Sequence, residues 1–268
     1  MPSDVESQKV TGARRPYSWF ILYVVSGIIQ AALTRWCLHA VPYDVTMVQQ
    51  SLVCLVLGAA LMYYQGHWGV PTLDQAKISV GVSLLWWLSL AASVLASAFE
   101  GVTVIYWHGA SMLLLPMIFV FFSKSRAIAP AVVQIVVSAL TGALAIYKSD
   151  SIDVAPDLPL VMNFIAVGLQ AARVWSAEMA LKTMAPVTLL TYCSLPLLAI
   201  TLIAGNTTEI LQSGHLWDLR GLLLQAGVFA CLLVQMHSLS HVGFIWALVG
   251  QSVRQLLWAV WVNFSILT

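Results

Sequence analysis

The segment GIIQAALTRWC, residues 27–37, returns in related form as GLQAARVWSAE at residues 168–178. Both copies contain an aliphatic residue followed by Gln-Ala-Ala, and each continues within about a turn to an arginine, Arg35 in the first copy and Arg173 in the second. Each copy lies inside a long apolar segment, where a charged residue is rare and informative. The pair predicts that two parts of the chain share one structural plan.

Nine long apolar segments, two of which contain these copies, predict a polytopic membrane protein. Hydrophobic residues make up 60% of the 268 residues and charged residues 9%, with a mean hydropathy of +0.88. That is too little charge to cover a soluble domain of this size. A hydrocarbon core about 30 Å thick takes about 20 apolar residues per helix. We therefore predict an all-α membrane helix bundle with spans at residues 18–38, 44–64, 78–98, 102–123, 127–147, 158–181, 186–205, 219–239 and 242–266.

The frame set by the two copies extends to the helices that follow them. Val45-Thr46 and Val187-Thr188 open the next helix of each half, and the same spacing relates the third helix to the eighth and the fourth to the ninth. Because five helices is an odd number, the second copy must insert upside down, which is the inverted-repeat plan of many secondary transporters. Chance alignment of similar apolar helices is the alternative.

The same frame predicts ten helices, one more than the apolar segments provide. The fifth helix should have a partner that begins just beyond Thr268, where the sequence ends. We therefore expect inverted five-helix repeats with the tenth helix missing. The expected divisions are a cytosolic tail at residues 1–17, a first repeat at 18–147 and a second repeat, truncated to four helices, at 158–268.

The basic residues predict the orientation in the membrane, since loops that carry more Lys and Arg stay in the cytosol. With a cytosolic N-terminus, the opposite side keeps only Lys148 and Arg220. The cytosolic side then collects Lys9, Arg14, Arg15, Lys77, Lys124, Arg126 and Lys182. We therefore predict a cytosolic N-terminus.

Arginines inside the predicted spans are the first candidates for a binding site, because a charge at the bilayer centre costs at least about 2.5 kcal/mol. Arg254 lies in the middle of WALVGQSVRQLLWAVW, where it cannot easily reach water. A guanidinium binds phosphate with two hydrogen bonds and keeps its charge, so Arg254 is predicted to bind an anionic substrate. A structural ion pair is the alternative. Arg173 could pair with Glu178, and Arg35 could either line the site or extend to the membrane surface.

Uncharged polar residues and one histidine complete the candidate site. His108 in VIYWHGAS is followed by small residues that leave open space, so a cavity-lining histidine and a packed core histidine are both open. Tyr192 and Ser194 in LLTYCSLP offer hydroxyl groups that could orient a sugar or a base, and Gln50 stands at the related place in the first repeat. Gln251 lies in the polar stretch just before Arg254.

No constellation of catalytic residues is found in the sequence, so we expect a protein that is not an enzyme. We expect no cofactor and no metal, since His237 and His241 lack a third ligand. Lys and Arg are scattered, which excludes nucleic acid as a partner. The expected partners are a phosphorylated small molecule and the lipid bilayer, and the lipid-facing surfaces leave open whether the chain forms a homodimer.

Four stretches resemble the nucleotide-sugar and triose-phosphate transporter branch of the drug/metabolite transporter superfamily. They are SGIIQAALTRW with VTMVQQSLVC, GLQAARVWSAEMAL with APVTLLTYCSLPLL, GVTVIYWHGAS, and HVGFIWALVGQSVRQL. In this resemblance, Arg254 stands where the family has a lysine, His108 stands where a substrate-facing lysine is common, and Gln255 replaces a second basic residue. Thr191, Tyr192, Cys193 and Ser194 occupy a family stretch in which two positions are usually asparagine.

The resemblance implies an antiporter in the Golgi or endoplasmic reticulum. A nucleotide sugar or related phosphorylated metabolite would be exchanged for nucleoside monophosphate or phosphate by alternating access. Gln255 in place of the second basic residue argues against a plastid triose-phosphate exchanger. Two further hypotheses remain. One is a non-transporting paralogue or truncated isoform that acts as a partner or scaffold, and the other is a small-metabolite exporter.

Overall fold

The computed structural model describes residues 16–66, 68–100, 128–148, 158–205, 207–212 and 214–265, and all regular structure in these ranges is helical. The helices are α1 (Pro16–Ala40), α2 (Tyr43–Tyr64), α3 (Leu73–Glu100), α6 (Ile128–Lys148), α7 (Leu158–Leu181), α8 (Pro186–Ala204), α9 (Thr207–Gln212), α10 (Leu219–Val242) and α11 (Phe244–Ser265).

Each predicted span that the structure describes coincides with a helix, and the ends differ by up to five residues. The predicted span at residues 102–123, with His108, lies outside the described residues. α3 begins at Leu73 rather than at residue 78, because Thr72 and Gln75 cap it reciprocally. The Thr72 amide donates to Gln75 Oε1 at 3.0 Å, and the Gln75 amide donates to the Thr72 hydroxyl at 3.3 Å. The short helix α9 was not predicted.

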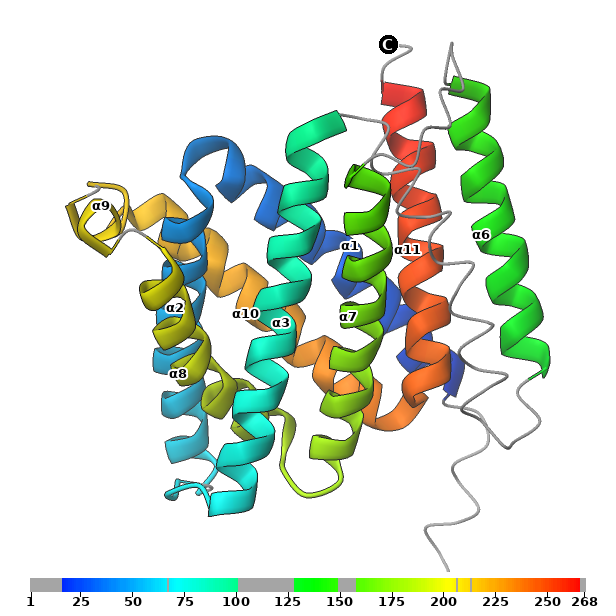
Figure 1. Cartoon of the computed structure of the whole chain (residues 1–268). Helices are drawn as coiled ribbons and strands as arrows, with labels where there is room; N and C mark the ends of the chain where they lie inside the picture. Colours follow the sequence, from blue (N-terminus) through cyan, green and yellow to red (C-terminus); the bar gives the residue numbers. More distant parts are fainter. Residues whose placement is uncertain are drawn as a thin grey trace, which may run out of the picture.

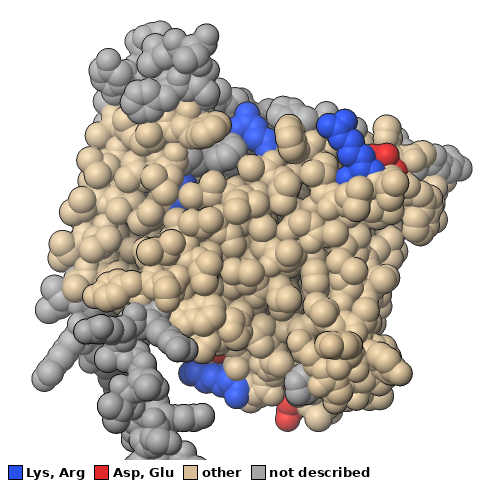
Figure 2. Space-filling model, turned by 180° about the vertical axis from the view of Figure 1, so that it is seen from behind, with Lys and Arg blue, Asp and Glu red and all other residues tan. Residues whose placement is uncertain are grey.

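Among the residues that the structure describes, four helical segments are long and apolar enough to cross a membrane, namely Tyr17–Leu38, Tyr43–Tyr64, Pro186–Ala204 and Leu219–Val242. Large apolar side chains also cover the outside of the bundle, including Val56 (63% exposed), Ile203 (85%) and Leu223 (66%). On one face, Lys, Arg, Asp and Glu gather toward two opposite edges and leave an almost uncharged band between them (Figure 2). The apolar helices and this band indicate an integral membrane protein.

The helices pack mainly as pairs that join distant parts of the sequence. α3 packs against α7, α1 against α10, α2 against α8, and α6 against α11. In Figure 1, α1 and α10 run behind α3 and α7, with α2 and α8 on one side and α6 and α11 on the other. At one end of the α1–α10 pair, the Trp19 ring stacks on His241 with centroids 4.6 Å apart.

Polar contacts also join helices inside the bundle. The Ser83 hydroxyl of α3 donates to the Cys193 carbonyl of α8 at 2.8 Å. Gln235 of α10 donates to the side-chain oxygen of Gln30 in α1 at 2.7 Å. α10 ends at Gly243, whose φ of 78° and ψ of 165° are open to glycine alone, and α11 begins at the next residue. This sharp connection allows α11 to run back along α1 and α7.

Candidate functional site

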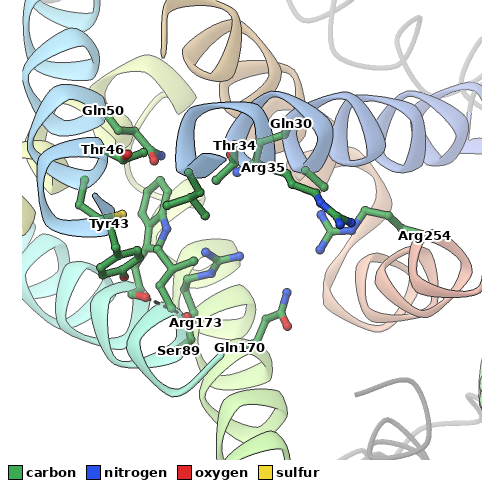
Figure 3. A pocket seen from close by; sticks show the side chains of 15 residues that line it. Gln30, Thr34, Arg35, Tyr43, Thr46, Gln50, Ser89, Gln170, Arg173 and Arg254 are labelled. Carbon is green, nitrogen blue, oxygen red and sulfur yellow. Dashed lines mark hydrogen bonds between the residues drawn. The ribbon is translucent and has the colours of Figure 1, made fainter. Parts of the chain in front are cut away.

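A cavity of about 340 Å³ lies where α1, α2, α3, α7 and α11 meet. Side chains reach it from these five helices (Figure 3). The polar residues that line it are Gln30, Thr34 and Arg35 of α1, Tyr43, Thr46 and Gln50 of α2, Ser89 of α3, Gln170 and Arg173 of α7, and Arg254 of α11. Met47, Trp86 and Leu90 contribute to its apolar wall.

The charge on this cavity is positive, since three arginines and no Asp or Glu are among the described residues that line it. Arg173 and Arg254 come from different helices, α7 and α11, and both line the cavity. Both side chains are partly buried. The Arg173 guanidinium lies over the indole ring of Trp86, 5.3 Å from its centroid, so a cation–π contact holds it.

The glutamines of the two repeated segments line the same cavity. Gln30 and Gln170, which occupy equivalent places in the sequence repeat, approach it from α1 and α7. The side-chain oxygen of Gln30 accepts the hydrogen bond from Gln235, which leaves its amide nitrogen as a donor. Gln50 is buried and lines the cavity from α2. The site therefore offers uncharged hydrogen-bond donors beside its positively charged arginines.

Four of the predicted site residues come together at this cavity, namely Gln50, Arg35, Arg173 and Arg254. Arg35 is the most exposed of its arginines. Gln251 is 3% exposed and is not among the lining residues. Its side-chain nitrogen instead donates to the Tyr23 hydroxyl at 3.3 Å. His108 lies outside the described residues.

The structure places the two predicted hydroxyl groups of α8 elsewhere. Tyr192 lines a second cavity, of about 300 Å³, between α2, α3 and α8, and donates to the Gly69 carbonyl at 2.9 Å. The buried Ser194 hydroxyl donates to the Leu190 carbonyl of its own helix at 2.6 Å. Neither residue is among those that line the cavity with the three arginines.

The predicted ion pair between Arg173 and Glu178 is wrong. Five residues on a helix turn through about 140° beyond a full circle, so the two side chains leave α7 on different faces. Arg173 faces the cavity, whereas Glu178 lies beside the α10–α11 connection. There a Cβ on Gly243 would lie 3.7 Å from the Glu178 Oε1.

Sequence reasoning missed several residues of the cavity, including Gln30, Gln170, Thr34 and Thr46. A signal for them was present, since each lies in a segment that the repeat or the family resemblance singles out. Uncharged polar residues are common in helix interfaces, so this signal alone does not separate a cavity from a packed seam.

No model of a known protein family matches the sequence, and the curated proteins contain no match to it.

Proposed function

We propose that the protein is a membrane antiporter of a phosphorylated metabolite, a nucleotide sugar in the first instance. The substrate would bind in the cavity between α1, α2, α3, α7 and α11. Nucleoside monophosphate or phosphate would be exchanged in the opposite direction. The observation that carries this proposal is the convergence of Arg173 and Arg254 on a cavity without an acidic lining residue in the described part of the chain.

The energetic argument starts from the cost of the two charges. Each arginine inside the membrane costs at least about 2.5 kcal/mol, and two like charges facing one cavity add repulsion. A phosphate or diphosphate would neutralise both and would accept paired hydrogen bonds from each guanidinium. The uncharged donors Gln30, Gln50 and Gln170 are suited to ribose or sugar hydroxyls. The cavity volume falls in the range of small-molecule sites.

The packing of the helices supports the inverted-repeat plan and, with it, alternating access. If α1 corresponds to α7, α2 to α8 and α3 to α10, the contact of α1 with α10 has its counterpart in that of α7 with α3. Likewise, the contact of α3 with α8 corresponds to that of α10 with α2, and the α2–α8 contact is its own counterpart. We propose that nine spans, including the one at residues 102–123, complete this arrangement. One repeat would rock against the other around the cavity.

We propose that the protein lies in the membrane of the Golgi or endoplasmic reticulum and that its N-terminus is in the cytosol. The α2–α3 and α7–α8 connections lie at the same end of the bundle in Figure 1. Lys77 in the first turns of α3 and Lys182 just after α7 therefore lie toward one side. The positive-inside rule supports a cytosolic place for that side.

Exchange in liposomes tests the proposal. The purified full chain would be reconstituted with a panel of unlabelled nucleoside monophosphates inside, and uptake of matching labelled nucleotide sugars would be measured. We expect uptake that depends on the internal nucleotide, and its loss in Arg254→Ala. Lys182→Ala, which removes a positive charge outside the cavity, should transport like the unaltered protein. Uptake that Arg254→Ala leaves intact would refute the assignment of the site.

A further inference from the structure

The seam between α1 and α11 brings two glycines against large side chains of the opposite helix. A Cβ on Gly27 of α1 would lie 2.9 Å from Nη1 and 3.0 Å from Cδ of Arg254. A Cβ on Gly250 of α11 would lie 2.9 Å from Cδ1 of Tyr23. Tyr23 and Gly27 are four residues apart on α1, as are Gly250 and Arg254 on α11, so each pair shares a face. A large side chain of each helix thus packs against a glycine of the other: Tyr23 of α1 against Gly250, and Arg254 of α11 against Gly27.

Tyr23 ties this seam to the cavity. The Tyr23 side chain is 5% exposed, and its hydroxyl accepts a hydrogen bond from Gln251 at 3.3 Å. Gln251 lies three residues before Arg254, on the neighbouring turn of α11. The Gln251–Tyr23 hydrogen bond therefore anchors the turn of α11 that precedes Arg254 on α1, inside the bundle.

The geometry points to Gly27 and Tyr23 as positioning residues that set the place of the Arg254 guanidinium at the cavity. This assignment rests on the proposed function, in which Arg254 binds the anion. Gly27 lets the arm of Arg254 lie directly on the α1 backbone, and Tyr23 holds the turn of α11 from which that arm extends. Neither residue lines the cavity. Both would act on the substrate only through Arg254.

The close contacts of Gly27 predict an effect on binding more than on folding. The atoms that a new methyl group would meet belong to the flexible arm of Arg254, which can move aside. That movement displaces the guanidinium, and paired hydrogen bonds to a phosphate demand a fixed geometry. At Gly250 the obstacle is instead the buried ring of Tyr23, so a methyl group there would strain the seam itself.

The first test uses inorganic pyrophosphate as the probe and calorimetry on the detergent-purified full chain. We expect Gly27→Ala to raise the dissociation constant about five- to tenfold, as partial loss of a charge-assisted hydrogen bond would. Gly168→Ala is the matched control, because a Cβ at this position on α7 would meet nothing within 4 Å. Its affinity should stay within about twofold of the unaltered protein, a difference of under about 0.4 kcal/mol. Tyr23→Phe deletes only the hydroxyl and should also weaken binding.

An Arg254→Ala background separates positioning from a general packing defect. Gly27→Ala should weaken binding no further once the arginine is gone, since it acts only through that side chain. An equal loss in both backgrounds would overturn the proposal. The proposal would also be overturned if the single variants Gly27→Ala and Tyr23→Phe both bound pyrophosphate with the affinity of the unaltered protein.

A second readout needs no ligand, so failure of the positioning assignment can be told from failure of the proposed function. If pyrophosphate and nucleotides do not bind the unaltered protein, the proposed function fails. The positioning assignment is then judged by modification of Arg254 with phenylglyoxal, an arginine reagent, followed by mass spectrometry. A rate that changes in Gly27→Ala and not in Gly168→Ala supports it. Equal rates in the two variants and the unaltered protein overturn it.

Discussion

Arg173 and Arg254 face one cavity, yet different neighbours hold them in place. Arg173 lies over the Trp86 ring on α3, whereas the arm of Arg254 lies against Gly27 on α1. The two positive groups are thus fixed by different helix pairs, α3–α7 and α1–α11. A movement of one pair relative to the other would change the distance between the arginines. In the proposed antiporter, α7 and α11 belong to the same repeat, so rocking of the repeats would move both arginines relative to Trp86 and Gly27 of the other repeat.

Trp86 provides a prediction at the scale of the residue. Replacing it with leucine removes the cation–π contact, worth about 0.5–2 kcal/mol, and should weaken pyrophosphate binding about 2- to 30-fold. Trp86→Phe keeps an aromatic face and should retain part of the affinity. Calorimetry on the two variants gives the comparison. Equal losses in both would show that the ring face contributes nothing and that only the lost volume matters.

The sequence predicts the arginines of the cavity better than its uncharged residues. A charge within an apolar span is costly enough to single out Arg173 and Arg254. Tyr192 and Ser194 could not be placed in this way. Their helix α8 is apolar on every side, so the pattern does not fix which face turns to the cavity. The pattern does not single out Gln30 and Gln170, because buried amides also occur in ordinary helix seams.

At the scale of the element, the long apolar helices follow from composition, and their ends follow from local chemistry. The start of α3 is set by the Thr72–Gln75 capping box, which a hydropathy pattern does not detect because its first turn is polar. α9 spans only Thr207–Gln212 and is too short for a periodic pattern. The order of helices was therefore predictable, whereas the details of their connections required the structure.

Gly243 gives a prediction about one of these connections. Its φ of 78° and ψ of 165° exclude side chains with a Cβ, so Gly243→Ala should destabilise the protein by about 1–3 kcal/mol. Gly168→Ala, inside a helix with open space around it, should instead stabilise by about 0.5–1 kcal/mol. Thermal unfolding of both variants in detergent compares them. A Gly243→Ala variant as stable as Gly168→Ala would mean that α10 continues into α11 without this turn.

At the scale of the molecule, helices far apart in sequence form a set of paired contacts. The match of the α1–α10 pair with the α3–α7 pair could not be read from hydropathy, because any long apolar helix can pack on any other. The sequence signals for it are the repeated Gln-Ala-Ala segment and the Val-Thr pairs that open the next helices, and Gln30 and Gln170 of that segment meet at one cavity. The proposed inverted repeat therefore makes a further prediction, about which connections share a side of the membrane.

Cysteine labelling in sealed vesicles tests this arrangement. Gly69, in the α2–α3 connection, and Lys182, after α7, are exposed at one end, and His215, before α10, is exposed in the α9–α10 connection. In α10, which starts near His215, the chain crosses between the ends of the bundle (Figure 1). An impermeant maleimide added outside should therefore give the same result for Gly69→Cys and Lys182→Cys. If these two are labelled in intact vesicles, His215→Cys should be labelled only after lysis, and the reverse should hold if they are protected. The native Cys37, Cys54 and Cys193 are buried and Cys231 of α10 is partly exposed, so labelling of the unaltered protein gives the background. Equal labelling of Lys182→Cys and His215→Cys in intact vesicles, with labelling of both rising no further on lysis, would place both connections on one side and contradict the proposed topology.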